Sequence, residues 1–374
     1  MARAVLHLIE TGGPGGAERM MVHLASSLGP GYHSEAALIR DRWLGGALKD
    51  RGIPVTILGN NPQGSIATLR DLVRVIRKKR VAILHTHEFF MNTLGLMASR
   101  LTGVPLVATV HERNYYPDRL RRRVAYRLVG RFAGQMVAVS EDLRRFLTER
   151  IGVCPDRIHV VANGVPVGEQ PSPRGVATLR KKLCLDQHTQ VLGTVGRLHS
   201  KKGHKYLIDA VGPVIRRFPH AVFLAVGAGG LRDELESQAR RLGVASHLRF
   251  LGHRDDVRDF LALCDLFVLP SLSEGMPLSL LEAMAAGVPA VATRIAGITD
   301  VVEDGKTGLL VPPADSRALA KGITTLLEDR MFARQMGEAG REVVACRFSL
   351  AGMVRAYQEI YATLIRERNG GGRW

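Results

Sequence analysis

Short apolar runs alternate with longer helix-like segments along almost the whole chain of 374 residues, and this alternation limits the possible folds most strongly. In the first half, the runs predict buried strands at 4–9, 81–85, 106–110 and 136–139, with helices such as 17–28 and 66–79 between them. The pattern restarts near residue 190, with strands predicted at 191–195, 222–226, 248–251, 266–270 and 290–292. Strands separated by helices of this length are typical of parallel βαβ units. We therefore predict an α/β fold with two doubly wound parallel-sheet domains.

The two domains are predicted to join in the stretch 163–184, where NGVPVGEQPSPRGV concentrates glycine and proline and loses periodicity. This gives an N-terminal domain over 1–166, a linker over 167–183 and a C-terminal domain over 184–349. Ligands of such sheets bind beyond the carboxyl ends of the strands, so we expect the domains to face each other across a cleft.

Composition excludes several classes of protein. With 46% hydrophobic and 23% charged residues, the chain is neither disordered, collagen-like nor a coiled coil. No apolar run reaches the roughly 18 residues that span a bilayer, and the first run stops at Glu10, too short for a signal peptide. The spacing of Cys154, Cys184, Cys264 and Cys346 suits neither a zinc site nor a disulfide framework, which favours a cytoplasmic location.

The net charge of +17 is the unusual feature of the composition. Residues 1–166 hold 24 basic and 13 acidic side chains, a net of +11, which leaves +6 for the rest of the chain. A field of this sign attracts polyanions. Charge alone does not choose between nucleic acid, an anionic membrane and phosphorylated substrates.

The segment 270–293, PSLSEGMPLSLLEAMAAGVPAVAT, predicts a strand end, a turn and a helix. Glu274 falls at the carboxyl end of the strand and Glu282 within the helix. We expect the first helical amides to be those of Gly275, Met276, Leu278 and Ser279. Such amides have no partner within the helix and suit an anion. The two carboxylates are then placed to bind sugar hydroxyls on either side of a phosphate. Taken alone, the segment fits an ordinary acidic helix start equally well.

A second candidate is 193–211, GTVGRLHSKKGHKYLIDAV, in which Gly196 permits a tight turn after a strand. Arg197, Lys201 and Lys202 follow before the next helix. A guanidinium and an ammonium at this position suit a diphosphate. The spacing is not that of a Walker loop, and on its own the string fits a solvated basic turn equally well.

Two glycine clusters follow strands but miss the dinucleotide fingerprint. ETGGPGGAE places Gly13, Gly15 and Gly16 before the first helix, with Glu18 where GxGxxG needs its third glycine. GAGG at 227–230 has Arg232 in that position. Both loops are compatible with phosphate approach or with plain tight turns, and they disfavour a nicotinamide enzyme.

Histidines end two predicted strands: His111 in VATVHERN, and His85 with His87 in LHTHE. A lone histidine is more often structural than catalytic, but the carboxyl end of a strand favours a functional role for His111. No group of residues shows metal-ligand spacing, so no metal is expected.

The segment 118–132, DRLRRRVAYRLVGRF, predicts a basic amphipathic helix. Its six arginines are Arg119, Arg121, Arg122, Arg123, Arg127 and Arg131. Leu120, Val124, Leu128 and Phe132 recur every four residues. The simpler interpretation is a solvated basic face over a packed apolar stripe. The alternative is a surface that docks on anionic lipid.

Taken together and in order, these strings resemble the retaining glycosyltransferases of family 4, also called group 1, which have the GT-B architecture of two Rossmann-like domains. The resemblance extends through GGPGGAE, VAVSEDLRRFL, VVANGV, GTVGRL with KG, AVGAGGLRDELE, LRFLGHRDDV, SEGMPLSLLEAMA and EDGKTGLLVPP. Its most specific part is the Glu-x7-Glu pair, Glu274 and Glu282, together with Arg197 and Lys202.

The resemblance implies that the C-terminal domain holds a nucleotide-sugar donor. Arg197 and Lys202 would neutralise the diphosphate, and Glu282 would bind the ribose hydroxyls. Glu274 would hold the sugar and the distal phosphate together with the backbone of four residues, which are Gly275, Met276, Pro277 and Leu278. The base would face the backbone of three others, which are Gly252, His253 and Arg254.

For the N-terminal domain, the resemblance implies an acceptor-binding role. His111 would reach the donor sugar, and the loop of Gly13, Gly15 and Gly16 would close over the phosphates and the acceptor. The final helix, about 350–374, would cross back onto this domain. The catalytic candidates are therefore His111, Glu274, Arg197 and Lys202.

The expected activity is metal-independent transfer of a hexosyl or N-acetylhexosaminyl group, with retention, to a glycan or lipid-linked acceptor in surface polysaccharide or glycolipid synthesis. A UDP-sugar is the expected donor and a GDP-sugar the alternative, with no further cofactor, and the enzyme is expected at the cytoplasmic face of the membrane. EGMPLS, Thr299 with Asp300, and Ala228 depart from common family patterns and leave the sugar open. A nucleotide-sugar 2-epimerase, an inverting transferase and, on charge alone, a nucleic-acid-binding protein remain alternatives.

Overall fold

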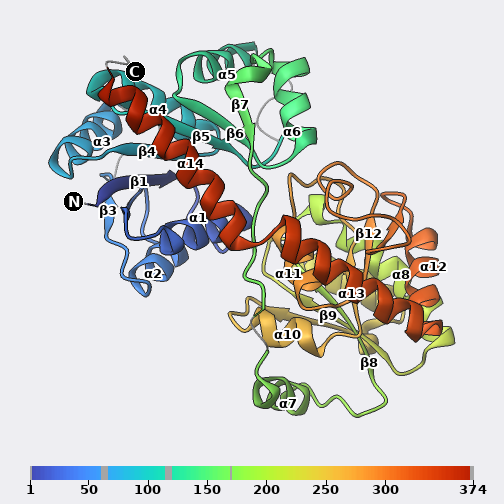
Figure 1. Ribbon diagram of the computed structural model, residues 1–374. Helices are drawn as coiled ribbons and strands as arrows, with labels where there is room; N and C mark the ends of the chain where they lie inside the picture. The colour runs from blue at the N-terminus through green and yellow to red at the C-terminus, as the bar shows by residue number, and fades with distance from the viewer. Residues whose placement is uncertain (1, 60–65, 114–119, 169–170, 371–374) are drawn as a thin grey trace. The chain divides into compact units, whose positions relative to one another are not determined.

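The computed structural model describes residues 2–59, 66–113, 120–168 and 171–370. The chain forms two compact units, one of residues 1–164 with 350–374 and the other of residues 165–349 (Figure 1). The last helix, α14 (Leu350–Asn369), thus belongs to the first unit although it follows the second in the sequence.

The first unit contains a seven-stranded parallel sheet in the order β3-β2-β1-β4-β5-β6-β7. Its strands are β1 (Arg3–Ile9), β2 (Tyr32–Leu38), β3 (Val55–Ile57), β4 (Ile83–His87), β5 (Leu106–Val110), β6 (Gln135–Ala138) and β7 (Ile158–Val160). Its other helices are α1 (Gly16–Ser27), α2 (Trp43–Lys49), α3 (Ile66–Lys78), α4 (Phe89–Thr102), α5 (Leu120–Phe132) and α6 (Glu141–Phe146), with short turns η1 (Leu147–Ile151) and η2 (Pro155–Arg157).

The second unit contains a six-stranded parallel sheet in the order β10-β9-β8-β11-β12-β13. Its strands are β8 (Gln190–Val195), β9 (Ala221–Val226), β10 (Leu248–Gly252), β11 (Leu266–Leu269), β12 (Ala290–Thr293) and β13 (Leu309–Val311). Its helices are α7 (Pro173–Lys182), α8 (His204–Arg217), α9 (Arg232–Arg241), α10 (Val257–Leu263), α11 (Leu278–Ala285), α12 (Ser316–Glu328) and α13 (Arg330–Arg347), with turns η3 (Ser200–Lys202) and η4 (Ala245–His247).

The two sheets share one topology, and the predicted fold class is confirmed. In each sheet the strand order reverses once, between β1 and β4 in the first unit and between β8 and β11 in the second. Ligands of doubly wound sheets bind beyond the carboxyl ends of the strands at such a reversal. The loops that follow β8 and β11 lie at this reversal in the second unit, and they carry the cations and carboxylates that were predicted to bind the donor.

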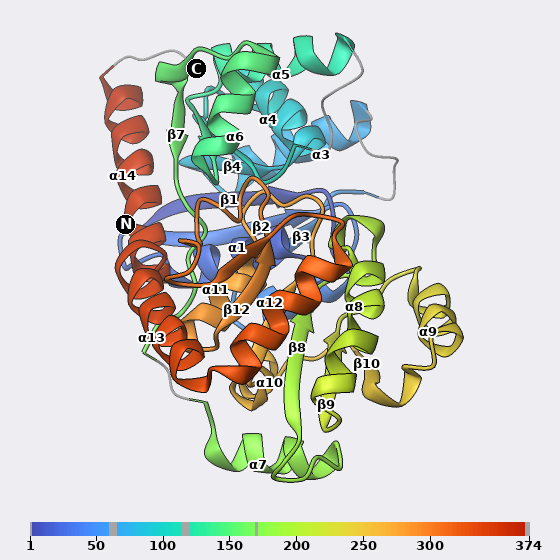
Figure 2. The same cartoon turned by 90° about the vertical axis from the view of Figure 1, so that its right-hand side faces the viewer.

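Both faces of each sheet are covered, which explains why the strands appear in the sequence as continuous apolar runs. In the second unit, Phe223 and Val268 pack with Val211 of α8 and Ile323 of α12, and all four are almost fully buried. In the first unit, α14 lies along the sheet in both views (Figure 1 and Figure 2). Its buried Tyr357 and Tyr361 reach hydroxyl and imidazole groups of the central strands.

Several element boundaries differ from the predicted ones. The strand expected at 81–85 is β4, two residues later, so His87 lies within it. A search for apolar runs misses four strands. Strand β2 begins with polar residues, and β3, β7 and β13 are only three residues long. The stretch 167–183 is not wholly irregular, since it contains α7. Ser172 caps this helix by accepting from Gly175 N, and Pro173 occupies its first turn.

Candidate active site

A partly buried ion pair lies at the strand reversal of the second unit. Lys202, at the end of η3 after β8, donates from Nζ to Glu274 Oε1 at 2.6 Å. Ser271 Oγ donates to the same carboxylate oxygen at 2.7 Å. Glu274 follows β11, and its side chain is only 9% exposed, against 22% for that of Lys202. The sequence thus correctly placed both groups after neighbouring strands, while their direct pairing is a feature of the folded loops.

Close backbone contacts hold these loops together. Gly203 has φ of +65°, and a Cβ at this position would overlap the carbonyl oxygen of Pro270. Gly297 has φ of +82°, and its Cβ would overlap the carbonyl oxygen of Gly275. Leu272 N also donates to Lys201 O at 2.7 Å. Only glycine permits this approach at this φ, so the two glycines fix the position of Lys202 beside Glu274.

Helix α11 begins at Leu278, with Pro277 in the capping position. The prediction that its first amides include those of Gly275 and Met276 is therefore wrong, because the Pro277 backbone is extended and starts the helix later. Leu278 is buried, and Glu282 lies half-buried one turn into the helix. The positive end of the helix dipole consequently points toward the loop that carries Glu274.

Arg197 is exposed in the turn that follows β8, and within the described part of the chain it forms no ion pair. The turn is fixed by Leu198 N, which donates to Ala228 O at 3.0 Å. Gly227, at φ of +142°, packs so closely that a Cβ would overlap the carbonyl oxygen of Gly196. The GAGG loop thus packs directly against the turn that carries Arg197.

The loop after β10 contains Gly252, His253 and Arg254. Gly252 has φ of +71° and accepts from Gly227 N at 2.8 Å, which ties this loop to the GAGG loop. The guanidinium of Arg254 binds both oxygens of Asp256, at 2.8 and 2.5 Å. This pairing keeps the pKa of Asp256 below its ordinary value. Because the Arg254 side chain is bound to Asp256, the backbone of this loop is the part available to a nucleotide base.

In the first unit, the glycine-rich loop joins β1 to α1. A Cβ at Gly15 would overlap the carboxylate of the buried Glu18, which would have to move aside. Gly13 and Gly16 have open space around the position of a Cβ. Glu18, which breaks the dinucleotide fingerprint, thus folds back against the loop.

His111 follows β5 and is buried, with 8% exposure. Its Nε2 is hydrogen-bonded to Nδ1 of His87 at 3.1 Å. Burial lowers the pKa of His111 to about 3, so its imidazole is neutral at pH 7. His85 is held by Thr109 Oγ1 at 2.8 Å and Tyr361 Oη at 2.6 Å. A neutral imidazole can donate or accept a hydrogen bond but does not supply positive charge.

Helix α5 turns its apolar stripe outward. Leu120, Val124, Leu128 and Phe132 are 74, 44, 45 and 39% exposed. The interpretation of this stripe as packed is therefore wrong, because Tyr126, Val129 and Gly130 form the buried face instead. No helix among the described residues is long and apolar enough to cross a membrane.

The arginines of α5 differ in their surroundings. Arg122 lies over the ring of Phe89, 5.7 Å from its centroid, and Arg127 Nε donates to Ile151 O at 2.5 Å. Arg123 is half-buried, whereas Arg121 and Arg131 are exposed. Arg119 lies outside the described residues. Only part of the predicted basic surface is thus available to a partner.

Three residues of interest escaped the sequence analysis. Ser271, which donates to Glu274, was signalled only by its position after β11. His204, at the start of α8, is buried, and neither of its ring nitrogens has a partner in the part of the chain that the structure describes. His7 aligns with His85 across β1 and β4, a signal that becomes visible once the strand register is known.

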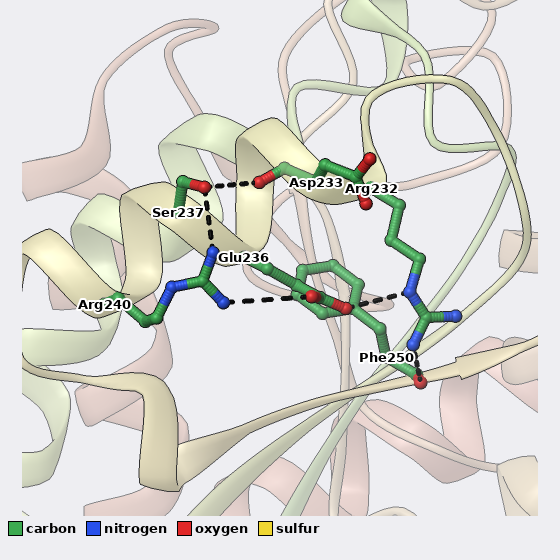
Figure 3. A network of polar contacts seen from close by, with 6 residues as sticks. All are labelled: Arg232, Asp233, Glu236, Ser237, Arg240 and Phe250. Carbon is green, nitrogen blue, oxygen red and sulfur yellow. Dashed lines mark hydrogen bonds and ion pairs between the residues drawn. The ribbon is translucent and has the colours of Figure 1, made fainter.

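A contrasting ion-pair network lies on the exposed surface of α9 (Figure 3). Glu236 sits between Arg232, at 2.8 Å, and Arg240, at 4.0 Å. Arg232 also reaches Phe250 O at 3.3 Å, and Arg240 reaches Ser237 Oγ at 2.9 Å. The contact of Arg232 with Phe250 connects α9 to β10, and the other contacts stay within the exposed helix.

Comparison with known proteins assigns both units. The family model described as Glycosyltransferase Family 4 matches residues 14–169, and that described as Glycosyl transferases group 1 matches residues 189–329. The D-inositol 3-phosphate glycosyltransferase of Corynebacterium glutamicum is 30% identical over 319 residues, 79% of this chain and 76% of that protein. The UDP-Gal:alpha-D-GlcNAc-diphosphoundecaprenol alpha-1,3-galactosyltransferase of Escherichia coli is 27% identical over 308 residues, 80% of this chain and 79% of that one.

Among solved structures, Anabaena HepE in complex with UDP and glucose superposes with a TM-score of 0.87 and 28% identity. The match covers 96% of this chain and 100% of that one. The chain therefore belongs to glycosyltransferase family 4, the group 1 enzymes, and is a glycosyltransferase with the GT-B fold.

Proposed function

We propose that this enzyme transfers a hexosyl or N-acetylhexosaminyl group from a UDP-sugar, with retention and without a metal, to a glycan or lipid-linked acceptor in surface polysaccharide or glycolipid assembly. The observation that carries the proposal is the Lys202–Glu274 pair, in which a cation contacts a carboxylate that lies in the loop just before the start of α11. A UDP donor is supported by Anabaena HepE, whose structures hold UDP with glucose and UDP-glucose, and by the E. coli relative, whose name specifies UDP-Gal.

In this proposal Arg197, Lys202 and the amides at the start of α11 stabilise the charge that develops on the departing diphosphate. Each well-placed donor contributes roughly 3–4 kcal/mol to such a transition state. Glu282 binds the ribose hydroxyls, and the backbone of 252–254 receives the base. Because fixed cations and dipoles supply the positive charge, the reaction needs no metal at the diphosphate.

The Lys202–Glu274 pair implies an exchange of partners when a donor binds. Lys202 leaves Glu274 for the diphosphate, and Glu274 then accepts from hydroxyls of the donor sugar, with Ser271 still holding it from behind. A buried carboxylate without its cation is costly, so sugar hydroxyls must replace the lost partner. The pair thus favours a ligand that carries both a diphosphate and a sugar over a nucleoside diphosphate alone.

His111 and the loop of Gly13, Gly15 and Gly16 complete the proposed site residues. The neutral imidazole of His111 is suited to hydrogen-bonding a sugar hydroxyl, and Gly13 and Gly16 leave backbone amides uncovered by side chains. Retention follows, in this proposal, from attack of the acceptor on the same face as the departing diphosphate.

The first test is thermal unfolding with UDP, GDP, ADP, CMP and NAD, each with and without EDTA. A ligand that binds only the folded protein adds about 2.7 kcal/mol of stability at one hundred times its Kd. We expect a shift with UDP that EDTA leaves unchanged, after which UDP-sugars are screened with acceptor and the product anomer is assigned by NMR. A shift with NAD alone would contradict the proposal, and donor consumption without acceptor would indicate an epimerase.

We further propose that the first unit docks on an anionic membrane surface at the cytoplasmic face. The exposed stripe of α5 continues onto Met97 and Leu101 of α4, which are 46 and 56% exposed. Phe132 lies between two guanidiniums, that of Arg100 at 5.3 Å and that of Arg131 at 5.6 Å from its ring centroid. Apolar side chains interleaved with arginines match a lipid interface, where each basic residue contributes about 1 kcal/mol.

Vesicle flotation tests this surface. Wild type is expected to float with vesicles containing phosphatidylglycerol and not with phosphatidylcholine alone. Arg121→Glu with Arg131→Glu should abolish flotation, whereas Arg51→Glu with Arg70→Glu changes the net charge equally at exposed sites elsewhere in the unit and should not. If both double variants lost flotation equally, net charge alone would explain vesicle binding and the α5 surface would be refuted. Binding of RNA in place of vesicles would favour the nucleic-acid alternative.

A further inference from the structure

Three histidines of the first unit lie on one face of its sheet at the point where the strand order reverses. His7 of β1 aligns directly with His85 of β4, and His87 lies two residues further along β4 on the same face. His7 and His85 have ring centroids 5.4 Å apart, and those of His85 and His87 are 4.3 Å apart. The register of two adjacent strands therefore brings His7 beside two histidines that lie about 80 residues later in the sequence.

These imidazoles are buried, and two of the three are incompletely hydrogen-bonded. All three residues have 0% exposure. Among the described residues, both ring nitrogens of His7 and Nε2 of His87 have no hydrogen-bond partner, whereas both nitrogens of His85 are bonded. One nitrogen from each of the three rings lies within 4.8 Å of the others. Buried polar atoms are seldom left unpaired in folded proteins, so the unpaired nitrogens of His7 and His87 beside the His85 ring indicate a ligand.

The remaining contacts orient the rings as outer partners do in metal sites. His87 Nδ1 lies 3.1 Å from His111 Nε2, which leaves its Nε2 as the free nitrogen. Tyr361 Oη holds His85 Nδ1 at 2.6 Å. Histidine ligands of metals are characteristically fixed through their second nitrogen in this way.

We propose that His7, His85 and His87 form a structural site for Zn²⁺ or a similar nitrogen-preferring divalent transition metal. Zn²⁺ binds imidazole nitrogens at 2.0–2.1 Å, which brings tetrahedral ligands to about 3.3 Å from one another, so the rings must close by a small rotation. His85 would release Thr109 Oγ1, now 2.8 Å from its Nε2, and this hydroxyl has a second partner in Tyr357 Oη at 3.2 Å. A water molecule would take the fourth position.

Such a metal would join β1 to β4 and, through the His85–Tyr361 contact, would connect the sheet to α14. The site involves none of Arg197, Lys202, Glu274 or Glu282, and it meets the proposed donor site only where His87 contacts His111. Bound metal is measured without any transfer reaction, so the failure of one proposal can be distinguished from the failure of the other.

The test measures bound metal and not activity. Untagged chain is refolded with excess ZnCl₂ or CoCl₂, desalted, and analysed by plasma mass spectrometry and visible absorption. We expect one metal ion per chain, and for Co²⁺ the intense visible bands of a tetrahedral site. Because the ligands have no exposed surface, native protein should take up metal much more slowly than refolding protein. Metal content well below one equivalent after refolding with either ion would overturn the proposal.

Variants locate the metal. His7→Gln and His87→Gln should each lose the Co²⁺ bands, whereas His33→Gln, at an exposed histidine of β2 in the same unit, should keep them. Zn K-edge absorption of wild-type protein gives an answer even if a variant misfolds. Three imidazole nitrogens are expected, and thiolate or predominantly carboxylate ligation would place the metal elsewhere and refute the site.

Discussion

The two sheets of this enzyme have the same strand order but opposite chemistry where that order reverses. In the first unit, the strands beside the reversal carry His7, His85 and His87, all fully buried and neutral. In the second, the loops after β8 and β11 carry Lys202 and Glu274, whose side chains keep 22 and 9% exposure. Topology fixes where a ligand is able to bind, while the residues that follow the strands determine which chemistry occurs there.

The second unit adds a further contrast, between a protected ion pair and exposed ones. Glu274 accepts from Lys202 and Ser271 within a stack of backbone loops, whereas Glu236 is shared by two arginines on the surface of α9 (Figure 3). The same kind of contact thus occurs in a partly buried loop cluster in one place and on an exposed helix surface in another. Substitutions in the two units test both contrasts, and the variants with the largest expected effects are described first.

Lys202→Ala should lower kcat/KM for the donor by on the order of 10²–10³, because it removes a charge aimed at the departing diphosphate. Lys205→Ala is the matched control, since Lys205 is exposed on the next helix and lies over the ring of Tyr206, 4.8 Å from its centroid. Steady-state kinetics with unchanged circular dichroism provide the measurement. Near-normal turnover by the Lys202 variant would remove the observation on which the proposed function rests.

Gly203→Ala should destabilise the second unit by on the order of 2–4 kcal/mol, since the new Cβ meets the Pro270 carbonyl at a positive φ. Gly230→Ala, where the same methyl group enters open space, should be almost neutral. Urea unfolding compares the two variants. Equal midpoints would show that the loops separate freely, and the predicted positioning of Lys202 would then be wrong.

Acid should destabilise the second unit through His204. Burial lowers its pKa to about 4 from an ordinary 6.5, so the unfolded chain binds more protons between these pH values. Stability is therefore complete above about pH 6.5 and decreases as the pH falls, by about 2 kcal/mol at pH 5.

Hydrogen exchange of peptides from 190–226 at pH 7.5 and pH 5 measures this effect within the second unit. His204→Leu should largely abolish the difference between the two pH values, and His220→Gln, at an exposed position, should preserve it. A His204→Leu variant with undiminished acid sensitivity would assign the effect to other groups.

Tyr361→Phe should cost the first unit about 1–2 kcal/mol, because His85 Nδ1 loses its 2.6 Å partner in a fully buried position. Tyr32→Phe is the control, since its hydroxyl makes a longer bond, 3.4 Å, to Gln358 O. The denaturant midpoints of the two variants measure these losses of stability. A larger decrease for Tyr32→Phe than for Tyr361→Phe would contradict the prediction.

Arg240→Ala should change the free energy of unfolding by less than about 0.5 kcal/mol, as is usual for exposed ion pairs. Its partner Glu236 is 33% exposed, and Arg240 itself is 62% exposed. A loss comparable to that of Gly203→Ala would mean that the α9 network is a stabilising unit and not a loose surface contact.

The sequence predicted the sheets well where strands are buried on both faces. Predicted strand 106–110 coincides with β5, and 191–195 differs from β8 by one residue, because such strands are uninterrupted apolar runs. Strand β2 escaped prediction because its exposed start, Tyr32 to Ser34, is polar. The motifs also identified Lys202 and Glu274, but their pairing depends on loops 72 residues apart in the chain.

Helix α5 shows why periodicity alone is insufficient. Leu120, Val124 and Leu128 form a regular stripe, but so do Tyr126, Val129 and Ala133 on the adjacent face. Glycine at position 130 decides between them, because a Cβ there would overlap Val153. Which stripe is buried thus depends on a tertiary neighbour that no local pattern contains.

The position of α14 has a consequence for the order in which the protein is made. Residues 350–369 leave the ribosome after the whole of the second unit, yet their tyrosines complete the first unit by contacting His85 and Thr109. During synthesis, the second unit can finish folding while the sheet of the first still lacks α14, so that the buried hydroxyl of Thr109 and ring of His85 wait for their tyrosine partners.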